Sequence, residues 1–314
     1  MEKPLTLEQK KQKVRDFRPI DDVFFEVLAD DILFCQEILR TILEDNKLIV
    51  NDVIVQSSER NLYGRSVRLD ALCTLGNGEK CNIEVQRSDN DDHLKRVRFN
   101  ASSITVKESQ VNDKFQDVAG VYVVYISEFD IFGKGRTIYH VENVIQETGD
   151  QVDDGLHRIF VNTACDDGTD IADLMSCFKE KQVNNPKFPV FTSRMNKLKN
   201  EEGGLNIMCE VMLKYEKIAA EDAAKKERIE AIQNMIDLGL SEDKILTKYS
   251  KEEYEKAKQG LLVETQCRKT HKKHTNSMRT HKTMWYERES VGNEMPSKPD
   301  KMGIVGIYCY MSGQ

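Results

Sequence analysis

The chain lacks the long apolar runs and the apolar leader that membrane and exported proteins carry. Of its 314 residues, 39% are hydrophobic and 32% are charged. No run approaches the roughly 18 consecutive apolar residues of a membrane-spanning helix. The first residues, MEKPLTLEQKKQK, are charged and contain no apolar stretch of the kind that a signal peptide requires. We therefore expect a soluble, cytoplasmic protein without a membrane partner, with one sizeable core and a smaller appendage.

Paired cysteine motifs are also absent. The eight cysteines lie at positions 35, 73, 81, 165, 177, 209, 267 and 309, and no two of them form a C-x-x-C pair. We interpret them as reduced thiols in the core or on the surface, as is typical of cytoplasmic proteins. Cys73 and Cys81 face each other in the hairpin predicted below, so an oxidising environment is the one setting in which a disulfide would form there.

The chain has no excess of positive charge, because its formal net charge is −7. Lys and Arg side chains that neutralise phosphates supply most of the non-specific affinity of proteins for DNA, so a nucleic-acid enzyme of this composition needs a local basic surface. The candidate basic cluster comprises Arg60, Arg65, Arg68, Arg87, Lys95, Arg96, Arg98 and Lys107. The alternative interpretation of this cluster is an ordinary solvated charged face.

The most informative segment that is present covers residues 67–87, VRLDALCTLGNGEKCNIEVQR. On both sides of Gly-Asn-Gly at 76–78, residues that would face inward and outward alternate with the period of two that is typical of a half-buried strand. Such a connection supplies the left-handed backbone positions of a tight turn, so the segment predicts a β-hairpin. With residues 76–78 as the loop, Asp70 faces Glu84 directly across the two strands.

The predicted hairpin therefore places two carboxylates on one face. Cross-strand neighbours have Cβ atoms roughly 4.5–5.5 Å apart, so two ionised carboxylates there repel each other unless a cation lies between them. Mg²⁺ is held by one or two carboxylates together with waters and phosphate oxygens, which suits phosphodiester hydrolysis. Gln86 projects to the same face as Glu84, whereas Ile83 and Val85 point into the core. Alternatively, Asp70 and Glu84 are solvent-facing residues of an amphipathic hairpin.

The pattern D-x(13)-E-x-Q, formed by Asp70, Glu84 and Gln86, resembles the PD-(D/E)XK nuclease core in the variant in which glutamine replaces the usual lysine. The flanking segments resemble the Rpn family of recombination-promoting nucleases, also called PD-(D/E)XK nuclease family transposases. These segments are IDDVFF at 20–25, NLYGRSVRLD at 61–70, NIEVQR at 82–87, KRVRFNASS at 95–103, YVVYIS at 122–127 and GKG at 133–135. The resemblance covers residues 16 to about 260.

The resemblance implies an α/β fold with a mixed central sheet flanked by helices. It implies a metal-dependent DNA endonuclease associated with recombination or mobile elements, with Mg²⁺ as cofactor and Mn²⁺ as its substitute. Asp70 and Glu84 would bind the metal, and Gln86 would position a water or a phosphate oxygen. The first helix would contribute a further catalytic acid, either Asp21 or Asp22.

The resemblance and the basic cluster together point to DNA as the partner. The candidate DNA contacts are Arg68, Arg87, Arg96 and Arg98. Two positions depart from the family, since Phe25 stands where many relatives carry lysine and Phe99 stands where tyrosine is common. An alternative is a catalytically silent member that binds nucleic acid or protein, because glutamine at the lysine position removes a charge that helps to stabilise the transition state.

Hydrophobic periodicity predicts the elements around the hairpin. We expect one or two helices over 21–44 interrupted near Asp30 and Asp31, a strand at 48–56, a helix from about 93 to 109, and a strand at 118–127 that is buried on both faces. Further strands are predicted at 137–143 and 158–162. His140 and His157 flank apolar residues in these strands, so we interpret both as structural.

We expect four regions along the chain: an N-terminal arm at 1–15, a nuclease-like domain at 16–200, a helical region at 201–264 and a basic, disordered tail at 265–314. A long amphipathic helix runs from 205 towards 237. Gly239, Ser241 and a capping box at Ser250 and Glu253 predict two short helices after it. Their mixed charge favours packing or homo-oligomerisation over DNA recognition, and a vestigial nuclease core with an assembly role is a third alternative.

The tail is foreign to the family, as expected of a shifted reading frame or an added extension. Its Cys267, His271, His274 and His281 match none of the usual zinc spacings, so a solvated basic tail is the interpretation that we prefer.

Overall fold

The structure is a computed structural model that describes residues 6–59, 67–89, 92–109, 112 and 114–259. The chain divides into two compact units between Ala220 and Glu221, inside the helix α7 (Glu202–Asp237). The other helices of the first unit are α1 (Leu7–Asp16), α2 (Asp22–Ala29), α3 (Ile32–Ile42), α4 (His93–Glu108), the 3-10 turn η1 (Phe115–Asp117), α5 (Asp170–Lys179) and α6 (Pro189–Asn200). The strands are β1 (Val50–Glu59), β2 (Val67–Leu75), β3 (Lys80–Gln86), β4 (Val121–Ser127), β5 (Ile138–Val141), β6 (Asn143–Val144), β7 (Gln151–Val152) and β8 (Leu156–Asn162).

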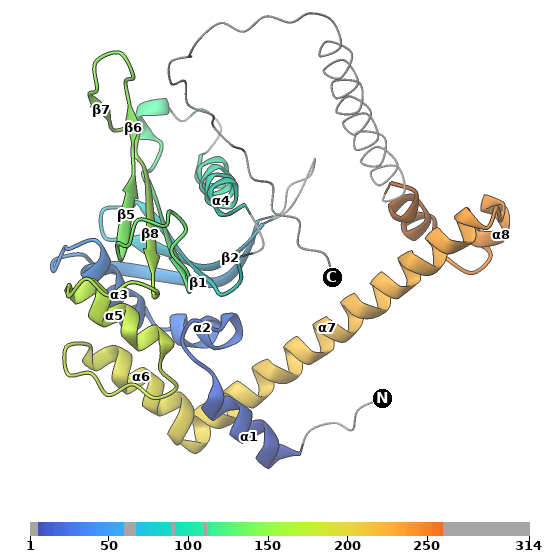
Figure 1. Ribbon diagram of the computed structural model, residues 1–314, viewed down its shortest axis with the longest axis horizontal. Coiled ribbons are helices and arrows are strands. Elements are labelled where there is room, and N and C mark those ends of the chain that lie inside the picture. The colour runs from blue at the N-terminus through green and yellow to red at the C-terminus, as the bar shows by residue number, and fades with distance from the viewer. Residues whose placement is uncertain (1–5, 60–66, 90–91, 110–111, 113, 260–314) are drawn as a thin grey trace, which may run out of the picture. The chain divides into compact units, whose positions relative to one another are not determined.

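A mixed six-stranded sheet in the order β1-β2-β3-β4-β8-β5 forms the centre of the first unit. β1, β2 and β3 pair antiparallel, β3, β4 and β8 pair parallel, and β5 returns antiparallel to β8. The short strands β6 and β7 form a separate hairpin that projects away from the helices (Figure 1). The fold class is therefore the α/β arrangement, with a mixed sheet flanked by helices, that the sequence predicts.

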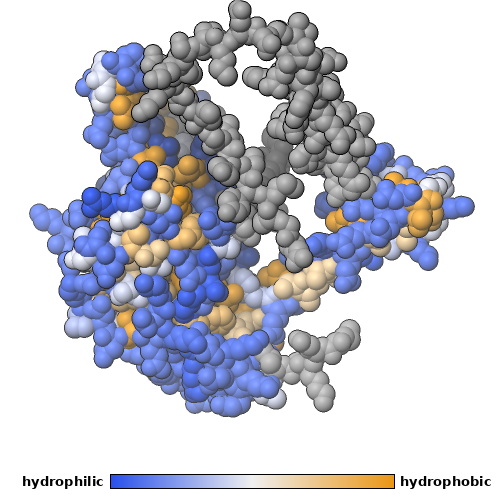
Figure 2. Space-filling view, viewed as in Figure 1, coloured by the Kyte–Doolittle hydropathy of each residue, from blue (hydrophilic) through white to orange (hydrophobic). Residues whose placement is uncertain are grey.

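Helices cover both faces of the sheet (Figure 1). On one face, α4 packs through Val97, Ala101 and Ile104 into a core that includes Tyr125 and Phe160. On the other face, α2, α3, α5 and α6 contribute to a larger core, which explains why β4 is buried along almost its whole length. Figure 2 shows a mostly hydrophilic surface on the face that it presents, interrupted by apolar side chains at the β6–β7 hairpin. None of the described helices is both long and apolar enough to cross a membrane.

The turn at residues 76–78 sets the register of the β2–β3 hairpin. The Leu75 amide donates to the Glu79 carbonyl at 2.9 Å, and Gly78 adopts a φ of 93°, which residues with a side chain rarely adopt. Cys73 pairs with Cys81, and the ladder continues to the pair formed by positions 71 and 83. This register is the predicted one. Both thiols are free and buried, with the pKa of the Cys81 thiol raised well above its usual value by burial.

Most other predicted elements are confirmed within a few residues. The helical segment at 21–44 forms α2 and α3, and β1, α4, β4, β5 and β8 lie where hydrophobic periodicity places them. The sequence analysis named no helix at α1, α5 or α6 and no β6–β7 hairpin. α5 and α6 are short helices, and each buries only one face against the sheet layer, so their periodic signal is brief.

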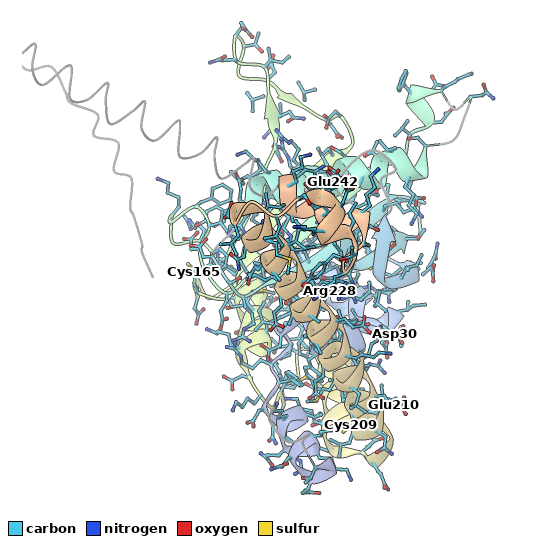
Figure 3. The ribbon with its side chains drawn as sticks, turned by 90° about the vertical axis from the view of Figure 1, so that its right-hand side faces the viewer. Asp30, Cys165, Cys209, Glu210, Arg228 and Glu242 are labelled. Atoms are coloured by element: carbon cyan, nitrogen blue, oxygen red, sulfur yellow. The ribbon has the colours of Figure 1, made fainter. Side chains whose placement is uncertain are left out.

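The second unit is a small helical cluster. It contains the C-terminal half of α7, the short helix α8 (Glu242–Leu246) and a helix at 251–259. Ile232, Ile245, Tyr254 and Ala257 form its core. Arg228, labelled on α7 in Figure 3, donates to a Glu253 carboxylate oxygen at 2.7 Å. The predicted capping box is present: the Ser250 hydroxyl accepts from the Glu253 amide, and the Glu253 carboxylate accepts from the Ser250 amide. The predicted tail at 265–314 lies outside the described residues.

Two adjacent glycines at the start of α7 differ in their surroundings and yield a stability prediction. A Cβ at Gly204 would overlap the backbone of Lys197 and Leu198 on α6, whereas a Cβ at Gly203 meets nothing within 4 Å. We expect Gly203→Ala to stabilise the protein by about 0.5–1 kcal/mol, because alanine favours the helical backbone. We expect Gly204→Ala to destabilise it by about 1–3 kcal/mol, because α6 and α7 must separate.

Chemical denaturation of the full chain and both variants measures this difference. Each glycine serves as the control for the other, since the two substitutions are chemically identical and lie in the same helical turn. Equal effects of the two changes would contradict the close approach of α6 and α7 at Gly204.

Candidate active site

The two carboxylates of the β2–β3 hairpin lie together at the C-terminal end of β3. The Asp70 amide donates to Glu84 Oε1 at 3.4 Å, and the Val85 amide donates to Asp70 Oδ2 at 3.1 Å. Each carboxylate therefore accepts a hydrogen bond from the backbone of the opposite strand. The expectation that Asp70 and Glu84 share one face of the hairpin agrees with this geometry, and the alternative in which both face solvent does not, because Glu84 is fully buried.

The Glu84 carboxylate has one satisfied and one unsatisfied oxygen. Oε1 also accepts a hydrogen bond from the Asn82 side-chain amide at 2.8 Å, one step along the same face of β3. Oε2 is buried and has no hydrogen-bond partner among the described residues. Buried carboxylate oxygens without a partner are costly, so this atom is available for a ligand.

The protein environment disfavours the ionised forms of both groups. Burial raises the pKa of Asp70 well above its usual value, and the neighbouring Glu84 raises it further. Burial also raises the pKa of Glu84, although the hydrogen bond from Asn82 and the charge of Arg96 oppose that shift. Two carboxylates in contact inside a protein behave in this way unless a cation neutralises them.

Arg96 is the cation nearest to this pair in the described structure. It belongs to α4, and its Nη2 lies 3.6 Å from the unsatisfied Glu84 Oε2. Its Nη1 donates to the Gln86 side-chain oxygen at 3.1 Å. The Gln86 amide nitrogen donates in turn to the carbonyl oxygen of Ser88 at 2.9 Å. Arg96 therefore links both polar residues of β3 that the sequence singles out.

The structure distinguishes between the two candidate acids of the first helix. Asp21, buried at the start of α2, accepts from the Arg18 amide at 2.7 Å and pairs with Arg87 at 2.8 Å. Asp22 is exposed, and it lies close enough to Asp70 and Glu84 to raise the pKa of both. The pKa of Asp22 is itself raised, mainly by desolvation, with Arg96 opposing. Asp22 is thus the acid of α2 whose charge acts on both carboxylates of the pair.

A hollow of about 500 Å³ adjoins these residues. It lies between the start of α2 and the end of β3, and its lining includes Asp21, Asp22, Gln86 and Ser88. Solvent and small ligands therefore have access to the side of the site that Asp22 and Gln86 border.

The four candidate DNA contacts differ in their surroundings. Arg98 on α4 is exposed. Arg68 is exposed at the start of β2, where its guanidinium lies 5.6 Å from the centre of the Tyr215 ring. Arg87 retains about half of its side-chain exposure but pairs with Asp21 and, at 3.5 Å, with Glu128. Arg96 points to the carboxylates. Two of the four, Arg87 and Arg96, therefore already lie beside carboxylates of the protein.

Sequence reasoning missed several residues that support the site. Asn82 lies two positions before Glu84, so strand periodicity alone was enough to find it. Tyr125 pairs with Glu84 in the β3–β4 register, and its hydroxyl lies 2.9 Å from Nδ1 of the buried His93. The Tyr215 hydroxyl donates to Glu26 at 2.6 Å. These last contacts join residues far apart in the chain, and one sequence contains no signal for them.

The donor set fits a hard divalent cation of the Mg²⁺ class. Asp70 and Glu84 offer carboxylate oxygens, and Glu84 Oε2 lacks a hydrogen bond. Mg²⁺ is commonly held by only one or two carboxylates and keeps several waters. Within the part of the chain that the structure describes, no three His, Cys, Asp or Glu residues are grouped as a metal site, so Asp22 does not complete a third ligand.

The repulsion inside the pair predicts the stability of a variant. We expect Asp70→Asn to raise the thermal midpoint by about 2–4 °C in EDTA at pH 8, because it removes one like charge and keeps the acceptor for the Val85 amide. An acid whose pKa is raised by folding costs the protein stability progressively as the pH rises from its unfolded to its folded pKa, so the gain should shrink at pH 5. Thermal unfolding at both pH values measures it, with Asp52→Asn on the exposed part of β1 as the matched control. A lower midpoint for Asp70→Asn at pH 8 would contradict the repulsion.

Comparison with known proteins finds a similarity to one family over part of the chain. Residues 26–165 match the family described as PD-(D/E)XK nuclease family transposase. This match spans the second half of α2, all of α3, the hairpin with Asp70 and Glu84, α4 and the parallel strands of the sheet. No curated protein and no solved structure matches the chain. Residues 26–165 of the chain are therefore similar to the PD-(D/E)XK nuclease family transposases.

Proposed function

We propose that this protein is a metal-dependent DNA endonuclease that hydrolyses phosphodiester bonds in recombination or element mobility. The observation that carries the proposal is the contact between Asp70 and Glu84 at the end of β3, where one buried carboxylate oxygen lacks a hydrogen bond. The family of residues 26–165 supports a nuclease and, through it, a DNA substrate. A cytoplasmic location and a homo-oligomer formed through the C-terminal helices remain predictions.

Asp70 and Glu84 would hold Mg²⁺ or Mn²⁺ through their carboxylate oxygens. A divalent cation supplies Lewis-acid stabilisation of a phosphate oxygen and lowers the pKa of a bound water. The hydrogen bonds from the amides of Asp70 and Val85 fix the orientation of both carboxylates. The side chains are therefore held before any ligand arrives, which lowers the cost of organising the site.

Three further residues would act on the water and the scissile phosphate. Gln86 is held by Arg96 and Ser88, so its amide group borders the hollow beside the carboxylates and would position a water or a phosphate oxygen. Asp22 borders the same hollow and would accept a proton or orient a water. Arg96 would supply the positive charge of the site, since Gln86 has none.

The DNA backbone would contact the exposed face of α4 and the start of β2. Arg98 and Arg68 are exposed there. Arg87 would join them only by exchanging its contacts with Asp21 and Glu128 for a phosphate. Phosphate contacts of this kind position DNA without reading its sequence.

Cleavage of supercoiled plasmid tests the proposal. We expect nicking in Mg²⁺ or Mn²⁺ that EDTA abolishes, and a rate at least about 100-fold lower for Asp70→Asn and Glu84→Gln, because both remove a proposed metal ligand. Asp52→Asn, which removes an exposed carboxylate from the neighbouring strand, should cleave like the natural protein. Equal cleavage by all four proteins, or none in any metal, would refute the proposed activity and favour a binding role.

Arg96 and Arg98 provide a second test, because both lie on α4 but only Arg96 contacts the site. We expect Arg96→Ala to lower the turnover rate about 100-fold with little change in DNA affinity, and Arg96→Lys to recover part of the loss. Arg98→Ala should weaken DNA binding a few-fold and leave turnover unchanged. Single-turnover cleavage and fluorescence anisotropy with labelled DNA in EDTA separate the two effects. Loss of DNA affinity alone in Arg96→Ala would assign Arg96 to DNA binding instead.

A further inference from the structure

A second cavity of the described structure lies at the opposite end of the sheet from Asp70 and Glu84. Its volume is about 520 Å³, which is within the range of small-molecule sites. The carboxylates lie at the C-terminal end of β3, whereas this cavity opens beside the hairpin turn at residues 76–78 and the first residues of β4 and β8. Tyr122 of the cavity pairs with Cys81, three residues and about 10 Å before Glu84 on β3. The cavity lining contains none of the residues of the proposed nuclease site, so the cavity is not part of that site.

One wall of the cavity is aromatic. Tyr122 and His157 are paired neighbours on the parallel strands β4 and β8, and their rings stack with centroids 4.2 Å apart and an interplanar angle of 21°. The floor is apolar and includes the buried Leu48, Leu75 and Ile159. Apolar side chains beside a stacked ring pair are suited to a planar heteroaromatic ring.

The polar groups of the cavity include one buried hydrogen-bond donor without a partner. Arg158 donates through Nη2 to the Asn143 side chain at 2.9 Å, but its Nε is buried without a hydrogen-bond partner among the described residues. Lys47 is exposed at the rim. The three carboxylates of the lining already accept hydrogen bonds, Asp45 from the Lys47 amide, Glu79 from Asn77 and Glu142 from the Gln151 side chain. An acceptor oxygen, such as that of a phosphate, is therefore the partner that Arg158 Nε lacks.

We propose that this cavity binds a nucleotide, with the base against the Tyr122–His157 pair and the phosphate at Arg158. The inference does not rest on the proposed nuclease activity, because it uses none of the residues of that site. A free mononucleotide and the phosphorylated end of a nucleic-acid strand share this chemistry, so the test includes both.

Isothermal titration calorimetry of the full chain in EDTA is the experiment. AMP, GMP, CMP and UMP are titrated separately, with adenosine and ribose 5-phosphate as the halves of the ligand. We expect at least one nucleotide to bind saturably, and each half to bind about tenfold more weakly or worse. Short oligonucleotides with and without a 5′-phosphate then decide the source, because only a strand-end site prefers the phosphorylated oligonucleotide to the free nucleotide.

Three variants separate this cavity from the rest of the molecule. His157→Ala and Arg158→Gln should each weaken nucleotide binding about tenfold, whereas Lys179→Gln, a charge removal on the exposed face of α5, should not. Asp70→Asn should bind as the natural protein does, even if it has lost cleavage. Thermal unfolding checks that the cavity variants are folded. Because the two cavity variants change different groups, one folded variant is enough to test the proposal.

The proposal is overturned if none of the four nucleotides binds saturably at millimolar concentration. It is also overturned if ribose 5-phosphate binds as tightly as the nucleotides, which would make the cavity a phosphate site only, or if a folded His157→Ala or Arg158→Gln protein binds as the natural protein does.

Discussion

The register of the β2–β3 hairpin is the constraint on which the candidate site depends. Side chains alternate faces along a strand, so a shift of one residue in this pairing would remove Asp70 from Glu84 and turn buried side chains such as Cys73 outward. The turn at residues 76–78 prevents that shift, with Gly78 in a backbone conformation that favours glycine. This one turn thus determines both which side chains of the hairpin are buried in the core and the contact between the two acids.

The register brings like charges together, and charged residues from other layers of the fold lie next to them. Arg96 reaches the pair from α4, which packs on the same face of the sheet as Tyr125. At the start of α2, Arg18 and Arg87 hold Asp21, and the charge of the next residue, Asp22, acts on Asp70 and Glu84. The acid pair alone would be a destabilising feature, and its retention with these supports is typical of functional sites.

The sequence predicted what is local and missed what is distant. Alternation around Gly-Asn-Gly predicted the hairpin, its register and the face of Asp70, Glu84 and Gln86. The choice between Asp21 and Asp22 stayed open, because it depends on how α2 approaches the sheet. It also depends on the ion pair between Asp21 and Arg87, which lies 66 positions further along the chain. The sequence predicted that Arg96 contacts DNA phosphates, because nothing in a single sequence indicates that α4 places the Arg96 side chain beside Glu84.

The negative charge of the site couples the binding of its two proposed ligands, the divalent cation and DNA. If Asp22, Asp70 and Glu84 ionise beside Arg96, two negative charges remain uncompensated on a protein of net charge −7. Such charges are partly buried, so salt screens them poorly and a DNA phosphate is repelled. A divalent cation would balance them, and thus raise the affinity for DNA. Linkage is reciprocal, so DNA would raise the affinity for the cation by the same factor, and a weak two-carboxylate site would fill mainly when the substrate is present.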